Sequence, residues 1–200
     1  MATQTQITRT VDGKELPVPG VWFVDPVHSE VQFTARHMMV SKVRGRFRDI
    51  SGVIVIDEVP ERSSVEATIV VASIDTGDET RDEHLRSSDF LDVERFPVAR
   101  FTSLLVSPAA PFSPSDFDKW QLEGNLTIRD VTRVVPLEVE LGGVAVDPWG
   151  KVRAGFRAWT EINREDFGIT WNQTLETGGF LVGKSVQIEI EIEAVRQAAD

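Results

Sequence analysis

The chain has 200 residues and a formal net charge of −11, from 32 acidic and 21 basic side chains. A nucleic-acid partner would require a basic surface that displaces counterions from the phosphates, so this charge argues against one. Cysteine is absent, which excludes disulfides, thiol catalysis and cysteine metal sites. The length suits one large all-β domain.

The first 20 residues are polar and end in Pro17, Pro19 and Gly20. They lack the apolar core of a secretory signal, and no apolar run elsewhere approaches the roughly 20 residues that span a bilayer. We therefore expect residues 1–20 to be a mostly disordered arm that precedes one domain over residues 21–197. We also expect a cytoplasmic protein.

Most of the remaining chain alternates apolar and polar residues with a period of two, which is typical of strands with one buried face. The clearest case is near the C-terminus, where Val186, Ile188, Ile190 and Ile192 alternate with polar residues. The expected strands cover residues 30–36, 43–48, 51–57, 65–71, 97–106, 122–129, 135–141, 152–162 and 186–193.

Every other residue in the second of these strands, and the residue just before it, is cationic: Lys42, Arg44, Arg46 and Arg48. On a strand the four charges project from one face. Two interpretations are open for this cationic stripe. It is either a solvated outer wall or a surface that attracts anionic head groups or a membrane.

One segment interrupts the strands. Thr80 and Glu83 have the spacing of a capping box and predict a short helix with Thr80 as its N-cap. Farther along, residues 107–118 contain three prolines, and we expect a long hairpin loop there.

Residues 178–185 match the written pattern of a phosphate-binding loop, from Gly178 to Lys184 and Ser185. Such a loop requires a helix directly after the lysine and serine, because the helix N-terminus binds the phosphates. Here the next residues show the clearest strand alternation in the chain. We therefore reject phosphate binding and interpret the segment as a glycine-rich hairpin or barrel rim.

The expected strands follow one another with short gaps and without alternating helices, which predicts an antiparallel meander. About eight such strands lose their exposed edges only by closing into a barrel. The interior of an eight-stranded barrel is either filled by side chains or wide enough for one small ligand. Periodicity leaves both interiors open.

The three histidines, His28, His37 and His84, lack the spacing of a zinc hydrolase site. No Gly-x-Ser-x-Gly motif is present to supply a serine nucleophile. We expect no metal and no cofactor. One catalytic alternative stays open, in which His84 works with Asp82 at the barrel mouth.

Several short motifs occur in a fixed order over about 175 residues. They are Asp25-Pro-Val-His28-Ser29, Val31-x-Phe33, Arg36-His37-Met38, Gly45-x-Phe47, Arg81-Asp82-x-His84-Leu85-Arg86-Ser87-x-Asp89-Phe90, Phe96-Pro97 with Phe101, and Asn163-Arg164-x-Asp166-Phe167-Gly168. In this respect the chain resembles the YceI-like family. Members of that family are lipocalin-like barrels that bind polyisoprenoid lipids or isoprenoid quinones in an apolar channel, often as homodimers.

The resemblance implies an isoprenoid lipid as the ligand here, held without catalysis, and also implies a homodimer. The membrane interpretation of the cationic stripe would add transient contact with a membrane surface. The resemblance nominates polar ligand contacts at His37, Arg81, His84 and Arg164. The candidate lining residues are Phe33, Phe90, Phe101 and Trp159. Two other functions remain as alternatives: an isoprenoid-modifying enzyme, and a plugged barrel that acts through its surface.

Overall fold

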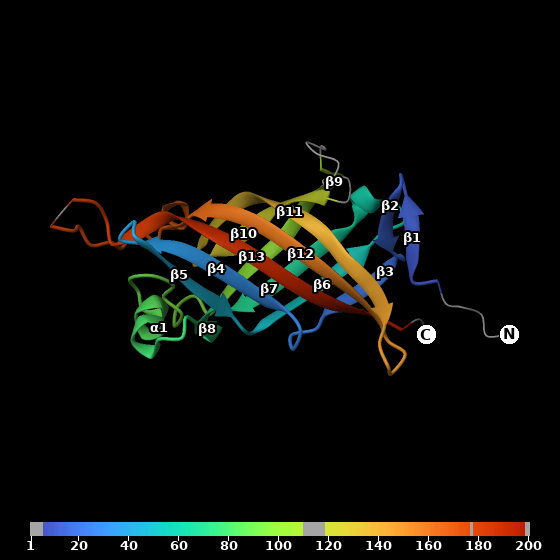
Figure 1. The fold of residues 1–200 in the computed structure, drawn as a ribbon, viewed down its shortest axis with the longest axis horizontal. Coiled ribbons are helices and arrows are strands. Elements are labelled where there is room, and N and C mark those ends of the chain that lie inside the picture. The colour runs from blue at the N-terminus through green and yellow to red at the C-terminus, as the bar shows by residue number, and fades with distance from the viewer. Residues whose placement is uncertain (1–5, 110–118, 177, 199–200) are drawn as a thin grey trace.

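The computed structural model describes residues 6–109, 119–176 and 178–198, and shows an elongated, twisted β-barrel with one α-helix at one end (Figure 1). The helix α1 spans Glu79–Arg86. The strands are β1 (Thr8–Val11), β2 (Lys14–Pro17), β3 (Gly20–Val24), β4 (Glu30–His37), β5 (Ser41–Phe47), β6 (Ile50–Ile56), β7 (Ser64–Val70), β8 (Ile74–Asp75), β9 (Val98–Pro108), β10 (Lys119–Ile128), β11 (Val131–Val146), β12 (Val152–Asn163) and β13 (Val182–Arg196).

The barrel is an eight-stranded antiparallel meander that closes on itself, as predicted. The order of pairing is β12-β11-β10-β9-β7-β6-β3-β13, and β13 pairs back with β12. Closure leaves no free edge in this part of the sheet, which protects a mostly β protein against edge-to-edge association.

Three of the barrel strands are broken. The long strand β13 pairs with β3 through residues 194–196 and with β4 through residues 182–191. In the same way, β5 and β6 are two segments of one barrel strand, and so are β7 and β8. Toward the helix end of the barrel, β4, β5 and β8 take the places of β3, β6 and β7. Since β8 has only two residues and α1 follows it, the barrel wall is interrupted at the helix end.

Every expected strand is present, and most are longer than the sequence pattern predicted. β13 already begins at Val182, so Gly183, Lys184 and Ser185 lie in a strand and not before a helix. The rejection of a phosphate loop is therefore confirmed. β3 was not predicted, because its five residues are mostly apolar and show little alternation.

The prediction of a disordered arm is wrong for residues 8–20. β1 and β2 pair as a hairpin that forms a separate two-stranded sheet over one end of the barrel (Figure 1). Leu16, Pro17 and Val18 are buried against the barrel. The polar composition of the segment did not indicate a hairpin. A few apolar side chains are enough to order it, because the barrel supplies the apolar surface against which they pack. Residues 1–5 lie outside the described residues.

The helix starts two residues earlier than the capping-box pattern predicted. Asp78 is the N-cap, and its side chain accepts a hydrogen bond from Arg81 N. Aspartate is a stronger N-cap than threonine and adds favourable charge at the helix N-terminus. Of the loop expected at 107–118, Ser107 and Pro108 belong to β9, and 110–118 lie outside the described residues.

The interior side chains form two apolar clusters along the barrel. One is centred on Leu122, Leu137 and Phe167, and the other on the fully buried Trp22 near the hairpin end. Within the described residues, no helix combines the length and hydropathy needed to span a membrane.

Candidate functional site: the barrel lumen

A cavity of about 260 Å³ occupies the barrel interior. Its lining comes from every barrel strand and reaches from the N-terminal hairpin to Leu91 in the segment after α1. The apolar lining residues are Leu16, Pro17, Val24, Val31, Phe47, Ile50, Ile54, Ile56, Pro60, Val65, Ala67, Ile69, Val71, Leu91, Ala99, Phe101, Val106, Trp120, Leu122, Leu126, Ile128, Val135, Leu137, Val139, Leu141, Phe156, Ala158, Ile188, Ile190 and Ile192.

Polar side chains in this lining are restricted to Arg9, Ser63 and Thr160. Ile188, Ile190 and Ile192 form the dry face that the sequence alternation predicted for β13. A lumen with so little hydrogen-bonding capacity suits an apolar guest, since a polar guest would lose its bonds to water without replacement.

Two aromatic rings lie over glycines inside the barrel. A Cβ atom at Gly124 would lie 2.3 Å from Phe101 Cζ, and one at Gly45 would lie 2.4 Å from Phe33 Cζ. Only glycine leaves room for these rings. The prediction that Phe101 lines the lumen is consistent with its position. Phe33 is on the inner face of β4 and packs on Phe47, which lines the cavity (ring centroids 5.7 Å apart).

The hairpin closes one end of this lumen. Leu16 and Pro17 of β2 and the side chain of Arg9 of β1 contribute to the lining. Arg9 holds the hairpin in place by donating from Nη1 to the backbone oxygen of Glu58 at 2.6 Å and from Nη2 to that of Asp57. Sequence reasoning missed these residues, since their role depends on tertiary docking.

At the opposite end, three rings form a cluster beside α1. His84 contacts Phe90 and Trp171 edge to face, with centroids 5.1 and 4.7 Å away, and its Nε2 lies 2.9 Å from Asp89 Oδ2. The structure therefore brings together the predicted residues His84 and Phe90. Neither is among the residues that line the cavity, and Trp171 was not predicted.

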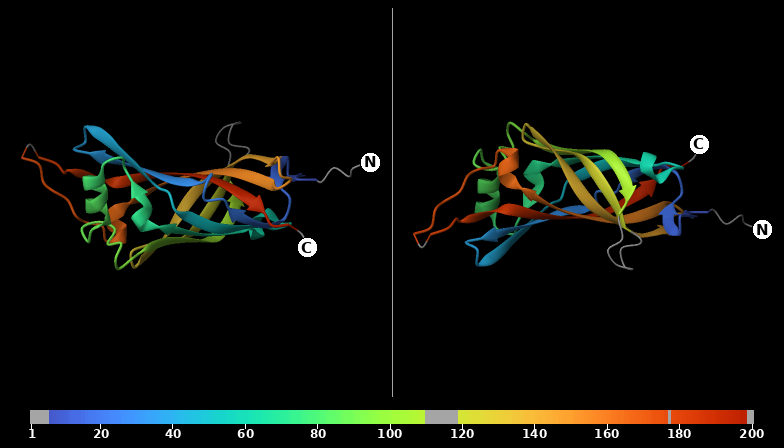
Figure 2. Two further views of the ribbon diagram at one scale, coloured as in Figure 1. Left: turned by 90° about the horizontal axis from the view of Figure 1, so that it is seen from below. Right: turned by 90° about the horizontal axis from the view of Figure 1, so that it is seen from above.

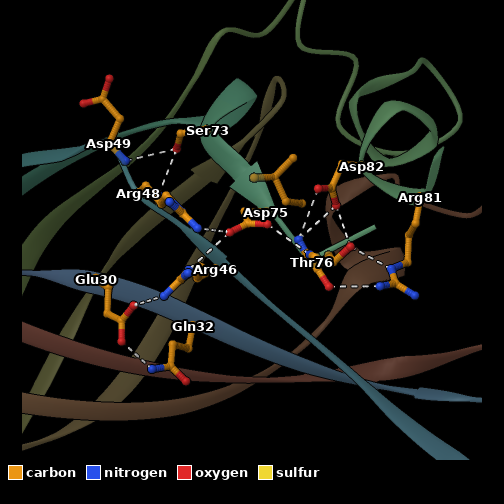
Figure 3. Close-up of polar contacts among 12 residues, drawn as sticks. Glu30, Gln32, Arg46, Arg48, Asp49, Ser73, Asp75, Thr76, Arg81 and Asp82 are labelled. Atoms are coloured by element: carbon orange, nitrogen blue, oxygen red, sulfur yellow. Dashed lines mark hydrogen bonds and ion pairs between the residues drawn. The ribbon is translucent and has the colours of Figure 1, made fainter. Parts of the chain in front are cut away.

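Asp82 and Arg81 converge on Thr76 (Figure 3). The buried Asp82 carboxylate accepts hydrogen bonds from Thr76 N at 3.0 Å and Thr76 Oγ1 at 2.5 Å. Arg81 Nε donates to Thr76 Oγ1 at 2.7 Å. Asp82 thus fixes the start of α1, while His84 pairs with Asp89. The geometry does not form the His84–Asp82 pair that a catalytic interpretation requires.

Arg164 is a structural residue and not an open ligand contact. Its side chain is buried and donates to the backbone oxygens of Gly183, Ile169 and Trp171 at 3.0, 2.7 and 2.9 Å. Burial lowers the pKa of this guanidinium. The expected contact with a ligand is corrected here, because the protein's own carbonyls take up its donors.

Trp159 is also corrected. Its neighbours on β12, Ala158 and Thr160, line the lumen, so Trp159 projects outward. It stands between Glu138 and Glu189 on the adjacent strands. The remaining predicted contact, His37, ends β4 on its inner face, opposite Ser41 and Val182, and is partly buried.

The cationic stripe divides into two parts. Arg46 is paired with Glu30 and Asp75, and Arg48 is paired with Asp75 (Figure 3). Hydrogen bonds from Gly77 N and Arg48 lower the pKa of Asp75. Lys42 and Arg44 lie nearer the β4–β5 turn and are exposed. Among the described residues, the positive charges of Lys42 and Arg44 are therefore not balanced by ion pairs, unlike those of Arg46 and Arg48.

A charged cluster fastens the break between β3 and β4. Arg153 donates to Asp25 at 2.7 Å, to Asp147 at 2.9 Å and to Glu193. His28 Nδ1 lies 2.9 Å from Asp25. Although Asp25, His28 and Glu193 place ligand-type atoms within 4.8 Å of one another, the Arg153 guanidinium already supplies the positive charge between the carboxylates.

This cluster predicts acid sensitivity. The hydrogen bonds from Arg153 and then His28 hold the pKa of Asp25 far below its usual 3.8, and Arg153 lowers that of Asp147. Because the pKa values of these two carboxyl groups are lower in the folded state than in the unfolded chain, their ionised forms stabilise the fold above about pH 4. This stabilisation is lost as the pH falls further. We expect Asp25→Asn to reduce stability at neutral pH and to flatten the decline in melting temperature between neutral and acidic pH. The exposed turn variant Asp130→Asn serves as the control, and an unchanged acid slope in Asp25→Asn would contradict the assignment.

Comparison with known proteins decides the family. The model of the YceI-like domain matches residues 22–194. The chain belongs to the YceI-like family. The match covers the barrel from β3 to β13, whereas the N-terminal hairpin precedes it.

Two curated relatives are similar over most of the chain. The UPF0312 protein of Staphylococcus epidermidis is 38% identical over 172 residues, which cover 84% of this chain and 94% of the relative. Protein YceI of Salmonella newport is 39% identical over 171 residues, which cover 85% of this chain and 83% of the relative.

Solved structures share the YceI-like fold. The Campylobacter jejuni YCEI protein superposes with a TM-score of 0.66 at 32% identity, covering 82% of this chain and 90% of that one. Burkholderia cenocepacia BcnA has a TM-score of 0.71 at 24% identity, covering 85% and 98%. A polyisoprenoid-binding domain from Saccharophagus degradans has a TM-score of 0.65 at 13% identity, covering 90% and 100%.

Proposed function

We propose that this protein binds a long-chain isoprenoid lipid in its lumen, for storage, transfer or sequestration. The observation that carries the proposal is the closed barrel with an internal cavity whose lining is apolar apart from three side chains. The ligand class is that of the polyisoprenoid-binding domain that shares the fold. Polyprenyl phosphates, polyprenyl diphosphates and isoprenoid quinones belong to this class.

Energetics indicate transfer from a membrane as the relevant process. Burying a prenyl chain of about forty carbons from water would contribute about 30 kcal/mol at ~0.8 kcal/mol per carbon unit. This exceeds the practical ceiling of about 18 to 21 kcal/mol for non-covalent affinity. Transfer of the same tail from a bilayer is nearly neutral, so the lumen makes exchange with a membrane feasible.

Binding is favoured over catalysis. A hydrolase or isomerase would need a nucleophile or a general base directed at the substrate. The candidate base His84 pairs with Asp89 and packs between two rings, and Asp82 is bonded to Thr76. A plugged barrel that acts through its surface is disfavoured by the cavity itself.

The test is organic extraction of the natively purified protein, followed by mass spectrometry. We expect one class of isoprenoid lipid, in a molar ratio close to one per barrel after incubation with a membrane extract. Extracts free of lipid, from protein that also fails to take up an added isoprenoid lipid, would refute the proposal. Recovery of a shortened or hydrolysed product from an added lipid would favour an enzyme instead.

A further inference from the structure

The turn between β4 and β5 carries exposed apolar side chains. Met38, Met39 and Val40 are 41%, 66% and 85% exposed. Met38 N donates to the backbone oxygen of Leu181, so Phe180, which is 52% exposed, lies next to the turn. We call Met38, Met39, Val40 and Phe180 the apolar tip. The β4–β5 turn lies at the helix end of the barrel, opposite the two termini (Figure 2).

The backbone of this turn is unfavourable for the residues it contains. Val40 N bonds to His37 O at 3.0 Å, and the two central residues, Met38 and Met39, have φ of 52° and 59°. Turns with two positive φ values strongly favour Asn-Gly, because other side chains clash with their own backbone. Strain of this kind concentrates where a site has a function.

Positive charge surrounds the tip in a chain that is otherwise acidic. Arg36, Lys42 and Arg44 are exposed on the outer face of β4 and β5. Arg36 stands directly opposite Lys42, and like charges in that register destabilise a sheet. The structure pairs none of the three with an acid among the residues it describes. Glu176, four residues before Phe180, is the acidic residue nearest to the apolar tip along the chain.

Turn chemistry, apolar exposure and cross-strand charge all lower the stability of the fold at this one place. We propose that the apolar tip docks on an anionic lipid bilayer, with Arg36, Lys42 and Arg44 facing the head groups. An apolar projection backed by cations is typical of interfacial membrane binding, in which apolar side chains enter the head-group boundary and cations bind anionic lipid. A second copy of this chain docked through the same face would place its own Arg36, Lys42 and Arg44 near these cations, and like charges repel.

The inference rests on the proposed function, because an isoprenoid lipid resides in membranes. Docking would bring the interrupted helix end of the barrel, where β8 and α1 replace a continuous wall, against the bilayer. The apolar lining that reaches Leu91 lies toward this end.

Co-sedimentation with vesicles tests the docking. The probes are vesicles of phosphatidylcholine alone and of phosphatidylcholine mixed with phosphatidylglycerol. We expect binding to the mixed vesicles that weakens with salt, and weak binding to the neutral ones. Lys42→Gln with Arg44→Gln should reduce the affinity about 25-fold, since each basic residue near an anionic surface contributes about fivefold.

A double variant separates docking from folding. Met38→Asn with Met39→Gly installs the preferred turn residues, so it should fold with an equal or higher melting temperature and yet lose most vesicle binding. The matched controls are Val134→Thr, an exposed apolar residue on β11, and Arg133→Gln beside it; both should bind vesicles as the unmodified protein does. Binding that persists in the turn variant, or equal binding to neutral vesicles, would overturn the proposal.

Two further measurements complete the test. If analytical sedimentation shows that the unmodified protein is a dimer and that the turn variant is a monomer, the apolar tip is an interface between copies and the bilayer proposal is wrong. Uptake of a detergent-dispersed isoprenoid lipid reports on the lumen alone. Lipid uptake without vesicle binding would refute docking and leave the proposed function intact, whereas vesicle binding without uptake would refute the proposed function.

Discussion

Replacing Ala158 with phenylalanine should reduce the lipid recovered from the purified protein by about tenfold or more, which corresponds to about 1.4 kcal/mol of lost binding free energy. Ala158 lines the lumen between Val139 and Ile190, which line it as well. An added ring would occupy a cavity of only about 260 Å³, so the ligand and the new side chain compete for one space. The measurement is extraction and mass spectrometry at equal protein concentration.

A second lumen variant protects this test against misfolding. Ala99→Phe fills the cavity from β9, on a different strand. The control Val134→Phe adds the same ring to β11 where the side chain is 58% exposed, and its lipid yield should not change. If both lumen variants melt like the unmodified protein and still yield full lipid, the ligand does not occupy the lumen.

Replacing Arg164 with alanine should lower the free energy of unfolding by about 3 kcal/mol, because several buried carbonyls would lose a charged donor. For a chain of this size that corresponds to a fall of roughly 10 °C in melting temperature. Lysine should not rescue it, since an ammonium group lacks the planar fork that reaches Gly183, Ile169 and Trp171 together.

The comparison for this variant is Arg157→Ala. Arg157 is an exposed arginine on β12 with a loose 3.7 Å ion pair to Glu191, and its removal should change stability by less than about 0.5 kcal/mol. Thermal unfolding followed by circular dichroism measures both. Arg164→Ala protein that melts normally but releases its lipid would show that Arg164 contacts the ligand, as the sequence first indicated.

Alternation was sufficient to predict the barrel, because a wall with one dry face imposes a period of two on each strand. The dry face of β13 was predicted correctly down to Ile188, Ile190 and Ile192. The strand breaks at β3–β4 and β7–β8 were not predicted. They depend on tertiary features, such as the Arg153 contacts with Asp25 and Asp147, that local sequence does not show.

The lining was harder to predict than the fold, for a physical reason. Aromatic side chains are usually assigned to the interior on account of their volume, which made Trp159 a candidate. On β12 the residues that face the lumen are Phe156, Ala158 and Thr160, so alternation places Trp159 on the outer face whatever its volume. Arg164 was also misassigned, because the sequence of a motif does not distinguish an arginine that binds a ligand from one that binds backbone carbonyl groups.

The N-terminal hairpin offers a way to alter the capacity of the lumen. It forms its own two-stranded sheet and touches the cavity through Arg9, Leu16 and Pro17. Residues matched by the family model start at 22, after the hairpin. Exchanging Leu16 and Pro17 for smaller or larger residues should therefore lengthen or shorten the chamber, and with it the preferred prenyl chain, while every barrel strand keeps its register.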